Sequence, residues 1–253
     1  MAGAVKGAGR RRADEGTPRI GPGRRLRATE AALRALHLEL AAFQPPGFGP
    51  TVHGPPVVSR VFLLGQAPGP HEARLGRPFA WTAGKTLFRW LEQATGAAEE
   101  AVRARVYISA VARGFPGKAR SGGDRVPTPE EIALWRPFVA REVEILGPAL
   151  VVPIGKLAIA EVLGERPLVE VIGRAFRAEW HGRDVEVVPL PHPSGASTWY
   201  KVEPGRTLLG QALRRLARHP ELRRALAGAV ERPGARAGTA VSAAPARRRP
   251  AAR

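Results

Sequence analysis

Two short segments of the sequence carry residue types that could do chemistry. Residues 65–69 read Gly-Gln-Ala-Pro-Gly, and residues 192–194 read His-Pro-Ser. Glycines beside a proline let backbone N–H groups approach a ligand and point at an anion. Prolines on both sides hold His192 in an extended turn, where its ring can donate a hydrogen bond to an oxygen that gains negative charge. Taken alone, a tight turn after a strand and a surface histidine would explain these segments equally well.

Other polar and aromatic residues also follow the predicted strands. Residues 113–118 read Arg-Gly-Phe-Pro-Gly-Lys and begin a glycine-rich loop that could line a groove for DNA. Phe79 could stack on a flat ring, and a place in the core is the alternative. Glu72 could orient the 65–69 loop or pair with an arginine, and we favour a structural role for it. The sequence has no Walker loop, no G-x-G-x-x-G fingerprint, no H-E-x-x-H motif and no Ser-His-Asp order.

Alternating strands and helices are predicted to position these segments. Apolar spacing and capping signals favour helices over 29–43, 83–95, 128–147, 156–163 and 206–227. Short apolar runs predict strands over 57–64, 105–111, 149–154 and 185–190. We therefore expect an α/β fold, a three-layer α/β/α sandwich with a central, mainly parallel four-stranded sheet. Ligands of such sheets bind outside the carboxyl ends of the strands, where the segments above lie.

The composition restricts the class of protein. The chain has 253 residues and a formal net charge of +18, so nucleic acid is its leading candidate partner. It contains no cysteine, which excludes disulfides, Cys-ligated zinc or iron–sulfur centres and a cysteine nucleophile. No apolar run approaches the roughly 18–20 residues of a membrane span, and no secretory segment is recognised. We expect a cytoplasmic, nucleoid-associated protein with no membrane partner and no metal.

Much of the charge lies near the two ends. Residues 1–27 hold eight Lys and Arg against two acids, and residues 229–253 hold six Arg against one acid. Both segments lack apolar periodicity, which is typical of disorder. The sequence therefore predicts a folded domain over 28–228 with a disordered basic tail on each side. The tails either assist nonspecific nucleic-acid binding or reflect an arginine-rich composition.

In their order, these motifs resemble the uracil-DNA glycosylase superfamily, and most closely its thermostable iron–sulfur class. That class typically reads G-E-A-P-G, then G-R-P-F, then an A-G helix start, and finally H-P-S. The corresponding segments here are 65–69 (GQAPG), 76–79 (GRPF), 83–84 (AG) and 192–194 (HPS). The resemblance runs from about residue 57 to about residue 216, and it rests on the ordered set rather than on any single motif.

The resemblance implies a monomeric hydrolase of base-excision DNA repair, and because the chain has no cysteine we expect it to need no cofactor. It would flip a deaminated base, uracil or a related one, out of DNA and hydrolyse its N-glycosidic bond. The catalytic residues implied are Gln66, Ala67 and His192. The substrate-binding residues implied are Gly65, Pro68, Gly69, Phe79, Ser109 and Ala110. The DNA-binding residues implied are Arg113, Lys118, Ser194, Gly195, Ser197 and Trp199. Trp199 would either enter the minor groove as a wedge or pack in the core.

Three departures from the class pattern leave the activity open. The four cluster cysteines are missing, so the chain falls outside the class as strictly defined. Gln66 stands where the class has Glu, and an amide can orient water but has no charge to activate it. Ala110 stands where the class has an Asn that reads the uracil edge, a contact worth roughly 1–3 kcal/mol. The alternative function is a non-catalytic nucleic-acid-binding relative that retains the base pocket. A third possibility is a nucleotide-binding α/β protein that holds a phosphate at 65–69.

Overall fold

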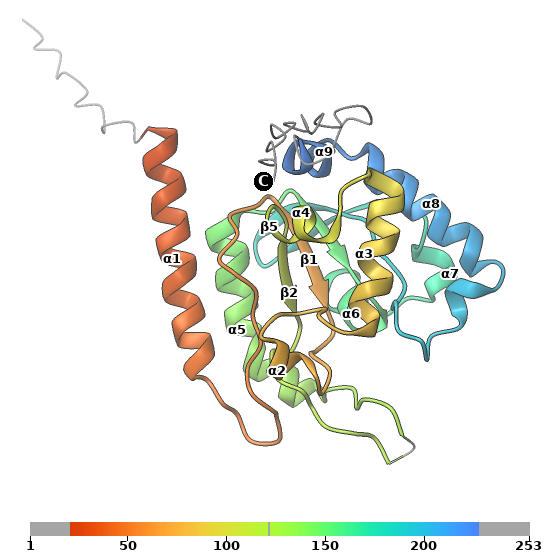
Figure 1. Ribbon diagram of the computed structural model, residues 1–253, viewed down its shortest axis with the longest axis horizontal. Coiled ribbons are helices and arrows are strands. Elements are labelled where there is room, and N and C mark those ends of the chain that lie inside the picture. The colour runs from red at the N-terminus through yellow and green to blue at the C-terminus, as the bar shows by residue number, and fades with distance from the viewer. Residues whose placement is uncertain (1–20, 121, 228–253) are drawn as a thin grey trace, which may run out of the picture.

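One five-stranded sheet forms the centre of the protein (Figure 1). The computed structural model describes residues 21–120 and 122–227. The strands are β1 (Val61–Gly65), β2 (Tyr107–Ala110), β3 (Leu150–Pro153), β4 (Phe176–Trp180) and β5 (Arg183–Val187), in the order β2-β1-β3-β5-β4. β1, β2, β3 and β5 run parallel, and β4 pairs with β5 in the antiparallel direction. The expected mainly parallel sheet is therefore confirmed.

The expectation of four strands is wrong, because the sequence analysis overlooked β4. This edge strand reads FRAEW and buries only Trp180, so it has no apolar run that would signal a strand. His181 and Gly182 connect β4 to β5, with φ angles of +48° and +71°. Positive φ at both positions is typical of a two-residue hairpin turn whose twist matches the strands. The two turn residues, rather than an apolar run, are the sequence feature that indicates this pair of strands.

Helices cover both faces of the sheet and give the expected three layers (Figure 1). One layer contains α1 (Pro22–Ala42) and α5 (Pro129–Leu146). The other contains α3 (Thr82–Thr95), α4 (Glu99–Arg103), α8 (Gly205–Arg218) and α9 (Pro220–Leu226). α6 (Lys156–Leu163) packs beside β3 and β4. The connections contain α2 (Glu72–Leu75), α7 (Leu168–Val171) and the 3-10 turn η1 (Trp199–Lys201).

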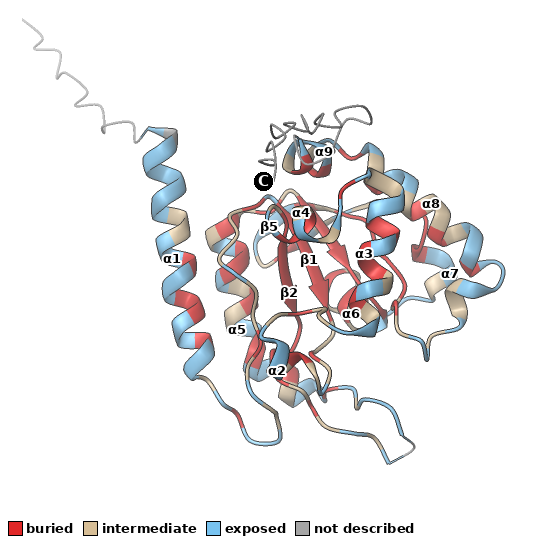
Figure 2. Cartoon of the chain, viewed as in Figure 1, coloured by how far each residue is buried: buried red, intermediate tan, exposed pale blue. Residues whose placement is uncertain are grey.

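Alternation along the strands builds a core on each face of the sheet. Leu63 and Val152 pack with the α3 and α8 layer, whereas Phe62, Leu64 and Val151 pack with the α5 layer. Successive side chains of a strand point to opposite faces, so both faces of a central strand must be apolar. Figure 2 shows the inner strands buried and the outer surfaces of the helices exposed.

Helix boundaries follow local backbone chemistry. α1 begins at Pro22, a residue that suits the first turn of a helix because no backbone N–H is needed there. The expected tail 1–27 therefore overlaps the first residues of this helix. Its remaining part, 1–20, and the tail 229–253 lie outside the described residues. α5 begins with the expected capping box of Thr128 and Glu131. The single helix expected over 206–227 is wrong, because Pro220 forces His219 into an extended conformation between α8 and α9.

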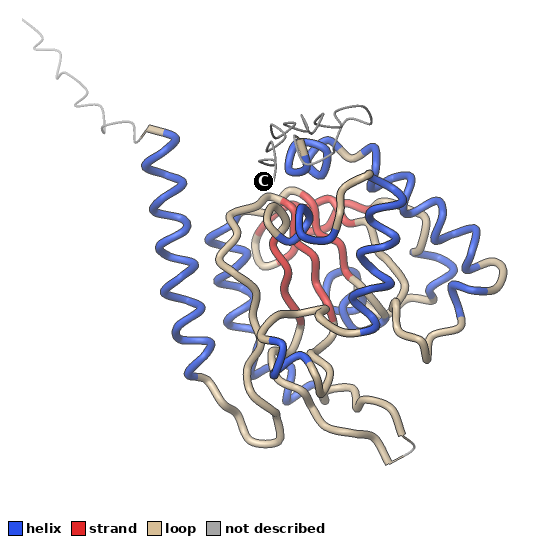
Figure 3. Tube along the Cα trace, in the orientation of Figure 1, coloured by secondary structure: helices blue, strands red, loops and turns tan. Residues whose placement is uncertain are grey.

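The register of the strands brings separate loops to one edge of the sheet. Gly65 and Ala110 are partners at the ends of β1 and β2, and a parallel bridge pairs Ile154 with Leu190 beyond β3 and β5. In Figure 3 the loops that follow these strands gather at one end, and the connection from β2 to α5 projects beyond it. Over residues 21–120 and 122–227, no helix is both long and apolar enough to cross a membrane.

Candidate active site

A cavity of about 370 Å³ lies at the carboxyl ends of β1 and β2. Gln66, Phe79 and His192, which are far apart in the sequence, line it together. Other lining residues from the sequence motifs are Gly65, Ala67, Pro68, Gly69, Ala110 and Ser194. This volume falls in the range of roughly 300–1,000 Å³ that small-ligand pockets occupy. The structure therefore brings the three motif segments to one hollow, at the edge where parallel sheets bind ligands.

The 65–69 loop continues β1 and is held by the chain that follows β2. Val111 donates its N–H to the carbonyl oxygen of Gly65 at 2.9 Å, and Ala112 donates to that of Gln66 at 3.0 Å. A side chain at Gly65 would not fit, because a Cβ there would lie 2.8 Å from the ring of Phe79. Glycine thus lets the Phe79 ring pack directly against the end of β1.

Glu72 joins the 65–69 loop to the segment that carries Phe79. It is 7% exposed, and its carboxylate accepts from the N–H of Gly69 at 2.6 Å and from the N–H of Ala80 at 2.9 Å. Burial raises the pKa of Glu72, and these backbone N–H groups oppose that shift. The two hydrogen bonds confirm that Glu72 orients the first loop.

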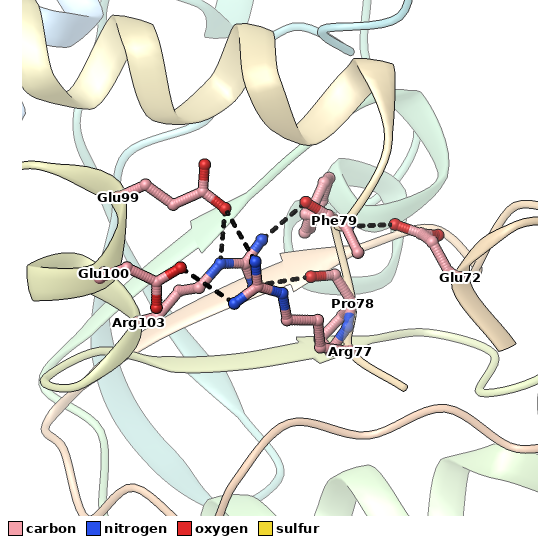
Figure 4. A network of polar contacts seen from close by, with 8 residues as sticks. Glu72, Arg77, Pro78, Phe79, Glu99, Glu100 and Arg103 are labelled. Carbon is pink, nitrogen blue, oxygen red and sulfur yellow. Dashed lines mark hydrogen bonds and ion pairs between the residues drawn. The ribbon is translucent and has the colours of Figure 1, made fainter. Parts of the chain in front are cut away.

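Arg103 holds the other side of the Phe79 segment (Figure 4). Its guanidinium donates to the carbonyl oxygen of Pro78 at 2.9 Å and to that of Phe79 at 2.7 Å. Phe79 has a φ of +53°, a left-handed conformation that costs a non-glycine residue roughly 1–2 kcal/mol. The carbonyl of Phe79 binds Arg103, and the N–H of Ala80 binds Glu72. Both ends of the peptide group between residues 79 and 80 are therefore fixed.

The surroundings of His192 determine its protonation state. Ser194 donates its N–H to Nδ1 of His192 at 3.3 Å, so the proton of the neutral ring lies on Nε2. Burial lowers the pKa of His192, and the charge of Asp124 opposes that shift. Gly155 leaves room for the ring, since a Cβ at this position would lie 3.0 Å from Cδ2 of His192. Within the described residues Nε2 has no hydrogen-bond partner, so this N–H is free to donate to a ligand.

A buried ion pair behind β2 corrects two expectations. Arg113 is 1% exposed and pairs with Glu142, which also accepts from the hydroxyl groups of Tyr107 at 2.7 Å and Ser109 at 2.9 Å. Ser109 therefore lies on the opposite face of β2 from Ala110, and its expected role in substrate binding is wrong. Arg113 reaches the cavity only from within the core, where Glu142 holds its guanidinium. The expected contact of Arg113 with DNA is therefore also wrong.

The other residues expected to bind DNA lie near or beyond the rim of the cavity. Lys118 is exposed and pairs with Asp124 at 2.6 Å. Gly195 is exposed, and Ser197 is half-buried. Trp199 is partly buried against the core that packs with α8, which agrees with its packing alternative.

Trp81 and Asp124 are rim residues that the sequence does not indicate. Trp81 is 43% exposed, lines the cavity and packs against His71 with ring centroids 4.5 Å apart. Asp124 lines the cavity from the loop between β2 and α5. No sequence signal marks either residue, because a single Asp in a glycine-rich loop is also typical of an ordinary turn. Only the fold brings them to the site.

The site does not fit a metal or an iron–sulfur cluster. In the part of the chain that the structure describes, no three His, Asp or Glu side chains gather in a way that could hold a metal ion. The thiolate ligands of a cluster are also missing, because the sequence contains no cysteine. Hydrogen bonds and ion pairs of Glu72, Arg103 and Glu142 hold the cavity walls.

Comparison with known proteins identifies one family and several similar enzymes. The family model of the uracil DNA glycosylase superfamily matches residues 51–217. The type-4 uracil-DNA glycosylase of Thermotoga maritima is 31% identical over 136 residues, which cover 54% of this chain and 65% of the relative. That of Archaeoglobus fulgidus is 30% identical over 141 residues (54% and 66%), and that of Sulfurisphaera tokodaii is 28% identical over 143 residues (54% and 61%). The chain thus spans somewhat less than two thirds of the length of these relatives.

Proposed function

This chain belongs to the uracil DNA glycosylase superfamily, and we propose that it is a DNA-base glycosylase. It takes a flipped, deaminated base into the cavity and hydrolyses the N-glycosidic bond of that base, which leaves an abasic site. One observation carries the proposal: a stacking ring (Phe79), a polar loop (Gln66) and a hydrogen-bond donor (His192) converge on one cavity. The similarity of this chain to three type-4 uracil-DNA glycosylases supports the same reaction.

Phe79 supplies the stacking surface for the flipped base. Its ring lies against the end of β1, and its backbone is fixed by Arg103 and Glu72. A fixed ring reduces the entropy lost when a flat base stacks on it. Stacking of this kind contributes roughly 1–3 kcal/mol per base.

His192 stabilises the leaving base. When the glycosidic bond breaks, the electron pair moves onto the base, and an exocyclic oxygen gains negative charge. A neutral ring with its proton on Nε2 can donate a hydrogen bond to that oxygen. The donor is held in place before the reaction, because Ser194 occupies Nδ1.

The base edge is read without an amide at position 110. Ala110 offers no polar group, and Ser109 is bound to Glu142 behind the strand. We assign the reading of the base edge to the Gln66 side chain and the backbone groups of the 65–69 loop, which lie beside Ala110 in the cavity wall. This arrangement favours recognition of a carbonyl-bearing, deaminated base rather than strict selection of uracil.

The rim of the cavity contacts the DNA strand. Trp81 and Val126 are exposed at 43% and 55%, and both line the cavity. Lys85 lies 5.9 Å from the ring centroid of Trp81 and can neutralise a nearby phosphate. The rim therefore combines apolar contact for a base or sugar with positive charge for the backbone.

Incubation with labelled oligonucleotides tests the proposed function. Single- and double-stranded substrates carry one uracil, hypoxanthine or xanthine, and alkali converts each abasic site into a strand break. We expect a break at one or more of these bases, and a loss of breaks with His192→Ala. Tight binding of such DNA with no cleavage of any base would instead favour the non-catalytic relative, for which Gln66 and Ala110 argue.

A further inference from the structure

Two carboxylates line the cavity among the described residues. Only one of them has an oxygen that accepts no hydrogen bond from another described residue. Glu72 uses both oxygens to accept backbone N–H groups. Asp124 accepts from Nζ of Lys118 at 2.6 Å through Oδ1. Its Oδ2 accepts no hydrogen bond from any residue that the structure describes. Asp124 therefore keeps one carboxylate oxygen available for a ligand or a water molecule.

The free oxygen of Asp124 lies beside the 65–69 loop at the cavity. A Cβ added to Gly69 would lie 3.7 Å from Oδ2 of Asp124, so this oxygen borders the 65–69 loop. The negative charge of Asp124 also reaches His192, whose pKa it raises against the effect of burial. The carboxylate thus borders the first loop and shares the cavity with His192. Lys118 pairs with this carboxylate, Glu72 borders Gly69 from the same cavity, and Arg113 and Arg125 also line that cavity.

The loop that carries Asp124 is fixed at its base. Arg125 donates to the Glu131 carboxylate at 2.6 and 2.8 Å and to the carbonyl oxygen of Pro116 at 2.9 Å. Glu131 belongs to the capping box of α5, so the loop is tied to the start of a long helix. An antiparallel bridge between Lys118 and Asp124 closes the loop above this anchor. Asp124 is therefore held at the cavity and is not merely a side chain of a free loop.

We propose that Asp124 is the general base that activates the attacking water. The inference rests on the proposed function. Hydrolysis of a glycosidic bond needs water at the anomeric carbon, and a carboxylate is the usual acceptor for the proton of that water. Gln66 cannot accept it, because an amide is neutral and barely basic.

In this step, water replaces the base at C1′ of the deoxyribose. The water oxygen bonds to C1′ of the deoxyribose, and Oδ2 of Asp124 takes one water proton. The bond between C1′ and the base nitrogen breaks, and its electron pair leaves with the base. The base anion is held by the Nε2–H of His192 and is then protonated by solvent. Asp124 returns its proton to solvent, and the products are a free base and an abasic site.

The experiment compares Asp124→Asn, Asp124→Glu and Asp124→Ala with wild type in single-turnover excision from the oligonucleotides above. We expect Asp124→Asn to lower the rate about 10²–10⁴-fold. Binding to duplex DNA with a tetrahydrofuran abasic site should stay within about threefold of wild type, since no attractive contact with phosphate is lost. Sodium formate should partly restore the rate of Asp124→Ala, and Asp124→Glu should retain part of it. Asp184→Asn, an exposed acid on β5, is the matched control.

The outcomes separate the two proposals. Wild-type protein that removes none of the three bases would overturn the proposed function. An Asp124→Asn rate within about threefold of a working wild type, or a loss that follows weaker DNA binding, would overturn the general-base role. NMR titration gives a readout without turnover: the pKa of His192 should fall further in Asp124→Asn. An unchanged His192 titration would show that the Asp124 charge does not face the site, which would also overturn the inference.

Discussion

Gly65→Ala should damage the site while leaving the fold intact. A Cβ at residue 65 would lie 2.8 Å from Cζ and 2.9 Å from Cε2 of Phe79. Carbon atoms pack best at about 3.5–4.0 Å, so the ring would have to move by about 1 Å. The Phe79 backbone cannot follow easily, because Arg103 binds its carbonyl at 2.7 Å and Gly84 packs tightly against that oxygen. The ring itself therefore has to move, and because it lines the cavity its movement changes the shape of the cavity.

The expected magnitudes follow from this displacement. Overpacking of this kind costs about 1–3 kcal/mol in the free energy of unfolding, which urea titration measures. A misplacement of about 1 Å at a reacting site can lower the rate about 10²-fold. Single-turnover excision should therefore fall by about two orders of magnitude in a protein that still unfolds cooperatively.

Gly54→Ala is the matched control for this prediction. A Cβ at residue 54 would lie 3.8 Å from its nearest neighbour, the carbonyl oxygen of Ile108, which is an ordinary contact. Its rate and stability should stay near those of wild type. A wild-type rate in Gly65→Ala would show that the position of the Phe79 ring does not determine the geometry of the reaction.

Three further predictions concern the groups around the cavity. His192→Ala should lower the single-turnover rate about 10²–10³-fold, because one donor to the developing charge is lost, and it should change binding to abasic-site DNA far less. Arg103→Lys should lower the free energy of unfolding, measured in urea, by about 1–3 kcal/mol, because an ammonium group cannot reproduce the paired donation to the carbonyl oxygens of Pro78 and Phe79. The pKa of His37 is lowered to about 3, mainly by burial, so between pH 6.5 and pH 3 the unfolded chain binds the proton that the folded one excludes. The contribution of His37 to stability is therefore present above pH 6.5 and is lost as the pH falls towards 3. The free energy of unfolding should drop by roughly 1 kcal/mol between pH 7.5 and pH 5.5, and His37→Gln should not show this drop.

The sequence predicted the layers of the fold because its apolar runs and capping signals are strong. α6 lies at the predicted residues, and the α5 capping box is present as expected. β4 was missed because an edge strand with one exposed face carries no apolar run. Its signal was the His181-Gly182 turn, which requires positive φ at both residues.

The site was predictable only in part, for a different physical reason. Motif order selected Gln66, Phe79 and His192, which do line one cavity. Ser109 was placed wrongly because neighbouring residues of a strand face opposite sides, and Ala110 already faced the cavity. Asp124 was not selected at all. Its relation to the cavity depends on a loop tied to the start of α5, and no spacing in the sequence encodes that distance.

The peptide group between Phe79 and Ala80 shows how the protein maintains a strained conformation at this site. A left-handed Phe would relax unless its neighbours prevented it. Arg103 takes the carbonyl oxygen and Glu72 takes the N–H of the same peptide group, so any rotation that relieves φ breaks a hydrogen bond to a buried ionisable side chain. Hydrogen bonds to charged groups contribute roughly 1.5–3 kcal/mol, which exceeds the strain of roughly 1–2 kcal/mol. The ring position is therefore fixed before DNA arrives, and substrate binding need not provide the energy to order it.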